Sequence, residues 1–143
     1  MSKMNWKRVF LGGLLAGIVI NVLGFAAYYI YLGNLWKPAM EAIGYPMEET
    51  AGMYIGSIIG SFVVGILAVW LYAAIRPRFG AGAKTAVTAG FFFWILSGLL
   101  PDLSLGSMGM FPANALIIDC ITTVVIIVVA TLLGAWIYKE PSQ

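Results

Sequence analysis

Histidine is absent from the 143 residues of this chain, and cysteine occurs once, as Cys120. The missing histidine removes the usual haem ligand, the commonest metal-binding side chain and the usual general base. One thiol can form neither an intrachain disulfide nor a metal site of several thiolates. No histidine or buried lysine is expected to activate a serine as a nucleophile, so we expect no enzymatic activity, no metal and no cofactor.

Charged residues are scarce as well. They make up 10% of the chain, against about 25% in a typical soluble domain. Hydrophobic residues make up 62%, and the mean hydropathy is +0.95. Water solvates a surface with so little charge poorly, so the composition predicts an integral membrane protein with the lipid bilayer as its main partner. It gives no reason to expect a nucleic-acid partner.

Four apolar segments have roughly the 20 residues that a membrane-spanning helix needs. We predict an all-α integral membrane four-helix bundle, formed as one transmembrane domain over residues 1–143, with helices at about 9–32, 53–75, 85–100 and 113–138. The third segment is short, and we expect it to stop at Pro101. The apolar, glycine-rich segment 101–112 is then a loop that re-enters the membrane or packs over the bundle.

The basic residues predict the orientation of these spans. With four spans, seven of the eight fall on one side: Lys3, Lys7, Arg8, Arg76, Arg78, Lys84 and Lys139. The other side has only Lys37, against the acids Glu41, Glu48, Glu49 and Asp102. The positive-inside rule therefore places both termini (N-in, C-in) in the cytoplasm. The first apolar stretch is too long for a cleaved signal peptide, so we expect it to be retained.

The longest outer connection is expected at 33–51. Residues 38–43 are predicted to form a short helix on the membrane surface, which Gly44 and Pro46 then end. Such a segment is either a simple interfacial connector, which we favour, or a lid or partner-docking surface.

Glycines recur at helical spacing in several of the predicted spans. Two series stand out: Gly13, Gly17, Asn21 and Gly24 in the first span, and Gly52, Gly56 and Gly60 in the second. Small residues let helix backbones approach closely in lipid, where no hydrophobic force drives helices together. These faces predict either a tightly packed monomer or an interface with a membrane-protein partner or a second copy.

Asp119 is the one charged residue expected inside a span. It lies about 9 Å along the fourth helix from its start, at about 1.5 Å per residue, with Thr122 and Thr123 on the same face. Ser57, Ser61 and Ser97 are expected at a similar depth on neighbouring helices, and Asn21 nearer the midplane. These seven residues are our candidate intramembrane polar site.

Three interpretations of Asp119 remain open. It is a proton or cation site, a hydrogen-bonded residue that fixes helix packing, or the partner of a basic group on another protein. Burial would let such a carboxyl titrate in a useful range. Because we expect no second acid or base within the membrane to form a relay, the sequence favours a structural role.

The basic turn between the second and third spans has a separate predicted role. Residues 79–85 look superficially like a phosphate-binding loop, but they lack the spacing of that motif and a preceding strand. We predict instead that Arg76, Arg78 and Lys84 anchor the turn on anionic lipid headgroups.

The stretch Trp70 to Ala86, WLYAAIRPRFGAGAKTA, is followed by Ala89, Gly90 and Trp94. This stretch resembles a group of uncharacterised bacterial four-helix inner-membrane proteins, chiefly through its Arg-Pro-Arg-Phe-Gly turn. The resemblance extends over most of the chain, from the glycine-rich first helix to the closing Trp-x-Tyr-Lys. It implies the same topology and a bacterial plasma membrane, and it implies no activity.

Our leading functional prediction is a non-enzymatic structural or accessory subunit of a membrane assembly. One alternative is a small transporter or channel that uses Asp119 and Asn21. Another is a lipid- or quinone-binding module that uses the apolar outer segment 101–112.

Overall fold

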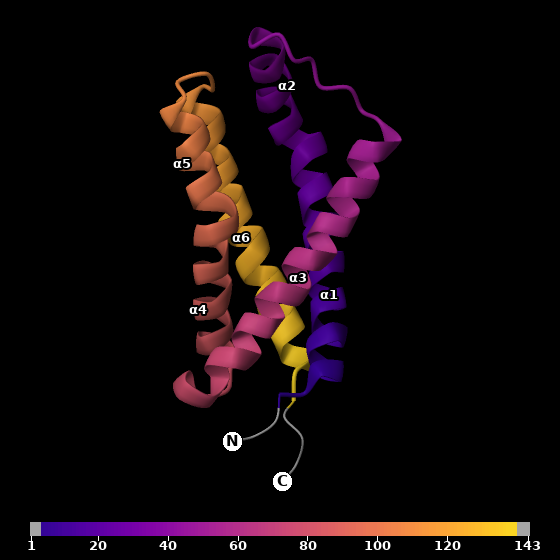
Figure 1. Ribbon diagram of the computed structural model, residues 1–143, viewed down its shortest axis with the longest axis vertical. Helices are drawn as coiled ribbons and strands as arrows, with labels where there is room; N and C mark the ends of the chain where they lie inside the picture. Colours follow the sequence, from indigo (N-terminus) through magenta and orange to yellow (C-terminus); the bar gives the residue numbers. More distant parts are fainter. Residues whose placement is uncertain (1–3, 140–143) are drawn as a thin grey trace.

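The structure, a computed structural model, describes residues 4–139 as helices without any strand (Figure 1). Four helical segments are long and apolar enough to cross a membrane: Trp6–Ala42, Ala51–Phe79, Ala83–Ser107 and Ala113–Ile137. The prediction of an all-α protein with four candidate spans is therefore confirmed.

The first segment is longer than predicted. It consists of α1 (Trp6–Ala27), the π-helical turn η1 (Tyr28–Leu32) and α2 (Gly33–Ala42). The expected loop from residue 33 is wrong, because the helix continues through Pro38 and the connection is only 43–50. Ala39, buried at 6% exposure, holds this extension against the rest of the chain. The predicted break at Gly44 is confirmed by its φ of 78°.

The second segment is a single helix, α3 (Ala51–Phe79). It begins where the Thr50 hydroxyl accepts a hydrogen bond from the Met53 N–H, the usual capping arrangement. It ends at Gly80, whose φ of 85° favours glycine. The helix therefore runs one turn beyond the predicted end at residue 75 and includes Arg76 and Arg78.

The third segment corrects the prediction that Pro101 ends a span. It consists of α4 (Ala83–Trp94), the π-helical turn η2 (Ile95–Leu99) and α5 (Leu100–Ser107). In η2 the Leu100 N–H donates to the Ile95 carbonyl, five residues back. This wider turn makes room for the proline ring, which clashes with the carbonyl four residues earlier in a regular helix. Asp102 consequently lies on a helix, and the loop is only 108–112.

The fourth segment, α6 (Ala113–Ile137), agrees with the predicted 113–138 to within one residue. Its end meets the start of α1, where the Asn5 side-chain amide donates to the Lys139 carbonyl at 3.1 Å. We call this the closed end of the bundle; it also contains the turn 80–82. The opposite end, with connections 43–50 and 108–112, is the open end.

The helices converge towards the closed end and spread towards the open end, where α2 and α5 stand apart (Figure 1). In the converging half, glycines allow backbones to touch: a Cβ on Gly65 of α3 would lie 2.5 Å from Gly17 N and 2.6 Å from Gly13 O of α1. Gly134 of α6 faces the Gly12 carbonyl in the same way. A buried cluster that includes Val9, Tyr72, Ala89 and Tyr138 fills this half.

Candidate functional site

Two carboxyl groups meet on neighbouring helices in the open half of the bundle. Asp102 of α5 is 8% exposed and lies close enough to Asp119 on α6 for the two carboxyl groups to interact electrostatically. The Cys120 thiol donates to Asp102 Oδ2 at 3.0 Å. Two acids that face each other in apolar surroundings are a candidate site for holding a proton.

The presence of Asp102 corrects our expectation that Asp119 has no acidic neighbour within the membrane. We assigned Asp102 to a loop that re-enters the membrane or packs over the bundle, because we took Pro101 as a helix end. Leu99, Leu100 and Leu103 surround Asp102, and this apolar run, which we interpreted as a loop at the membrane, also fits a helix that continues past the proline. One acid among leucines at helical spacing indicates a buried acid on a continuing helix.

Two side chains reach α6 from the first helical segment. The Trp36 indole N–H of α2 donates to Asp119 Oδ1 at 3.4 Å, and its ring meets Phe111 edge-on with centroids 5.6 Å apart. The Tyr31 hydroxyl of η1 lies 2.8 Å from Thr122 Oγ1. The carboxyl pair is thus connected to the other arm of the open end by long side chains.

The third helical segment is tied to the same part of α6. The Trp94 indole N–H donates to Thr123 Oγ1 at 3.1 Å, and that hydroxyl in turn donates to the Asp119 carbonyl at 2.9 Å. Gly98 makes room for the Trp94 ring, since a Cβ there would lie 2.8 Å from it. The middle of α6 therefore makes polar contacts with two other helical segments, the first and the third.

The predicted polar site is divided by the structure. Asp119, Thr122 and Thr123 belong to the network on α6. Asn21, Ser57 and Ser61 instead line a separate pocket of about 170 Å³ between α1 and α3. Ser97 joins neither group: it is exposed, and its hydroxyl donates to the Phe93 carbonyl of its own helix.

A charged contact closes the connection at the open end. Lys37 Nζ lies 2.6 Å from Glu49 Oε1, and the Tyr54 hydroxyl donates to Glu49 Oε2 at 2.8 Å. The hydrogen bond from Lys37, followed by the one from Tyr54, lowers the pKa of Glu49. This contact connects α2 to the start of α3. It lies on the side of α2 that faces away from α5, the helix that contains Asp102.

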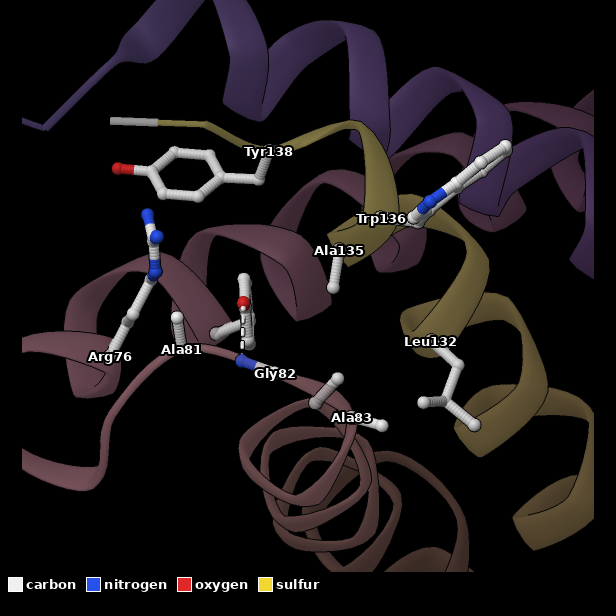
Figure 2. A pocket seen from close by; sticks show the side chains of 10 residues that line it. Arg76, Ala81, Gly82, Ala83, Leu132, Ala135, Trp136 and Tyr138 are labelled. Atoms are coloured by element: carbon white, nitrogen blue, oxygen red, sulfur yellow. Dashed lines mark hydrogen bonds between the residues drawn. The ribbon is translucent and has the colours of Figure 1, made fainter. Parts of the chain in front are cut away.

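The predicted lipid anchor lies at the closed end. Arg76 lines a pocket of about 280 Å³, where its guanidinium stands 5.5 Å from the centre of the Tyr138 ring (Figure 2). The Gly82 N–H donates to the Tyr72 hydroxyl at 3.3 Å within the same pocket. Arg78 and Lys84 are exposed beside this turn. Anchoring on headgroups stays a prediction for these three basic residues.

Comparisons with known proteins give no identity: no protein-family model, no curated protein and no solved structure matches the chain.

Proposed function

We propose that this protein is a small transporter of a bacterial plasma membrane that carries protons down the membrane potential. The observation that carries the proposal is the pairing of two acids on neighbouring helices, Asp102 and Asp119, of which Asp119 also accepts a hydrogen bond from the opposite arm through Trp36. Intramembrane carboxyl groups that contact one another are characteristic of proton relays, and two such groups cannot both remain ionised in an apolar setting.

The contacts suggest how proton binding is linked to movement. When Asp119 is ionised, it accepts a charge-assisted hydrogen bond from Trp36, which holds α2 against α6. A proton on Asp119 weakens that bond and releases the arm. The open end then widens around the cavity of about 480 Å³ that α2 and the loop 108–112 line. The closed half, where backbones touch, stays in place as a fixed base.

The proposal includes a topology. The basic residues gather at the closed end, so we place that end and both termini in the cytoplasm, and the carboxyl pair in the outer half of the membrane. The resemblance to bacterial four-helix inner-membrane proteins supports the same location. A reporter that works only in the periplasm should be inactive when fused after Gln143; an active fusion would refute this orientation.

The test is proton movement in proteoliposomes that contain a pH-sensitive dye and a potassium gradient. Wild-type protein should acidify or alkalinise the lumen when the membrane potential is imposed with valinomycin, and Asp102→Asn and Asp119→Asn should abolish this response. Glu48→Gln, an exposed acid on the 43–50 connection, is the matched control and should behave as wild type. An Asp119→Asn variant with undiminished flux, or a silent wild type, would refute the proposal.

The leading sequence interpretation, an accessory subunit or homo-oligomer, is the second candidate. It is favoured by the outer half of α3, where a Cβ on Gly56 or Gly60 would meet nothing within 4 Å in the described chain. Ile55 and Ile59 are also exposed there. A small-residue face of this kind fits another transmembrane helix. The mass of the complex after gentle solubilisation distinguishes the candidates: a defined hetero-complex favours the subunit, and a monomer favours the transporter.

A further inference from the structure

The pocket between α1 and α3 is distinct from the carboxyl pair. It has a volume of about 170 Å³ and extends along one side of α1 and the outer half of α3. Its lining contains oxygen-bearing and aromatic side chains and no charged residue: Ile20, Asn21, Gly24, Phe25, Tyr28, Met53, Tyr54, Ser57 and Ser61.

Asn21 presents an unsatisfied acceptor in this pocket. Its Nδ2 donates to the Gly17 carbonyl at 2.9 Å, and this bond fixes the amide, because a flipped amide would set two oxygens against each other. Its Oδ1 is buried and has no hydrogen-bond partner among the described residues. The hydroxyl oxygen of Tyr28, another lining residue, is also buried without a partner within the described chain. Unsatisfied polar atoms are costly in a membrane interior, so both atoms call for a ligand.

The other lining groups define the charge of that ligand. Ser61 donates its hydroxyl proton to the Ser57 carbonyl at 2.9 Å, so its oxygen faces the pocket as a further acceptor. Phe25 and Tyr54 lie with their ring centres 6.1 Å apart. Aromatic faces favour a cation over an anion, and the amide and hydroxyl oxygens can accept hydrogen bonds from it. A bare metal ion prefers a shell of oxygens alone, whereas ring faces suit an organic cation.

We propose that this pocket binds a primary ammonium group. Its N–H donors satisfy Asn21 and the hydroxyl oxygens, while its charge and its first carbons lie against the aromatic rings. The volume corresponds to about six water molecules at roughly 30 Å³ each, which suits an alkylammonium of four or five heavy atoms. The ammonium belongs either to a soluble amine or to the ethanolamine headgroup of a lipid. This site does not depend on proton transport by the carboxyl pair.

The first measurement is the binding of butylammonium to the purified protein in detergent. Thermal unfolding and calorimetry are the two methods that detect it. Butylammonium should raise the unfolding temperature, whereas butanol, which has the same chain and no charge, should not. Asn21→Leu should weaken binding by about tenfold or more, the effect of one charge-assisted hydrogen bond. Asn34→Leu, an asparagine on α2 outside this pocket, should bind as wild type.

A second variant and a lipid measurement complete the test. Ser57→Ala, at an exposed lining position, should fold normally and weaken binding by a few-fold even if Asn21→Leu does not fold.

Native mass spectrometry from nanodiscs then counts the lipids that the protein retains. Selective retention of phosphatidylethanolamine over phosphatidylcholine, lost in Asn21→Leu, assigns the headgroup as the source; butylammonium binding without that selectivity assigns a soluble amine. Equal effects of butanol and butylammonium would show that the pocket does not recognise the ammonium charge and would overturn the proposal, as would binding unaffected by both variants.

Discussion

Gly65 and Gly56 lie on the same helix, about two and a half turns apart, in opposite surroundings. A Cβ on Gly65 would collide with the backbone of α1, whereas a Cβ on Gly56 would meet nothing within 4 Å in the described chain. The closed half of the bundle is therefore held by backbone contact, and the open half by long side chains. Backbone contact leaves no room to adjust, so we expect any movement in the open half, which also contains the carboxyl pair and the α1–α3 pocket.

The largest expected effect is that of a larger side chain in the closed half. Gly65→Val should destabilise the fold by about 3 kcal/mol or more, because the clash is with backbone atoms that cannot rotate away. Gly56→Val should change the stability by less than about 1 kcal/mol. Unfolding in mixed detergent measures both. If Gly56→Val proved as damaging as Gly65→Val, the outer face of α3 would have to be packed against another helix, which would favour the subunit or oligomer candidate.

A smaller effect is expected where α4 meets the network. Gly98→Ala should displace the Trp94 ring and weaken its bond to Thr123, at a cost of about 1–2 kcal/mol. Gly106→Ala is the matched control on the same helical segment. Its Cβ would lie 3.2 Å from the flexible tip of Leu116, which can yield. Equal losses in unfolding free energy for the two variants would argue that Trp94 does not anchor the open half.

Trp36→Phe is expected to act on the open end with little effect on the fold. The substitution keeps a ring against Phe111 and removes the indole N–H that bonds Asp119, a change of about 0.5–1.5 kcal/mol. Labelling of a cysteine placed at Thr122 by a water-soluble maleimide should become faster in this variant, because α2 is released from α6. The cysteine at position 122 already removes the Tyr31–Thr122 contact, so Tyr31→Phe should label like the parent and serves as the control. Unchanged labelling in Trp36→Phe would show that the arms are held by other contacts.

The smallest expected effect concerns the exposed tie between Lys37 and Glu49. Because the pKa of Glu49 is lowered below its ordinary 4.5, the tie contributes at higher pH and is lost as the pH falls through that lowered value. Hydrogen exchange of residues 43–50, corrected for the intrinsic rate, should therefore increase on acidification to about pH 3. Glu49→Gln should show the increase already at pH 6, and Glu41→Gln should not. A Glu49→Gln variant that exchanges like wild type would rule out a stabilising role for the pair.

How much the sequence predicts also differs between the two halves. Four apolar runs and clustered glycines were enough to predict four spans with close packing, and the limits of α6 were correct to one residue. In a membrane helix, small residues at helical spacing mainly serve to let two helices pack closely, so this pattern predicts helix packing directly. The candidate acid Asp119 was likewise identified from its position within an apolar run.

The open half was harder to predict because its helices contain residues that usually end helices. Pro38 was taken to begin a separate short helix and Pro101 to end a span, but α2 continues through the first, and a π-helical turn accommodates the second. A π-helical turn is defined by which backbone carbonyl each N–H bonds, and no particular residue type in the sequence marks it. The same error removed Asp102 from the helix and so hid the carboxyl pair. Asn21 and Asp119 lie in different sites because α3 leans outward from the bundle. No single residue in the sequence predicts that tilt.

The most direct test of the account is the distance across the open end as a function of pH. Spin labels at Ala42 and Met110, in a Cys120→Ser background, report the separation of α2 from the 108–112 loop by pulsed electron paramagnetic resonance in nanodiscs. The account predicts a shorter, narrower distance distribution at pH 8 than at pH 5, and a distribution independent of pH in Asp119→Asn, whose amide oxygen can accept from Trp36 at both values. Identical distributions for wild type at the two pH values, or a pH response that persists in Asp119→Asn, would contradict a proton-linked opening.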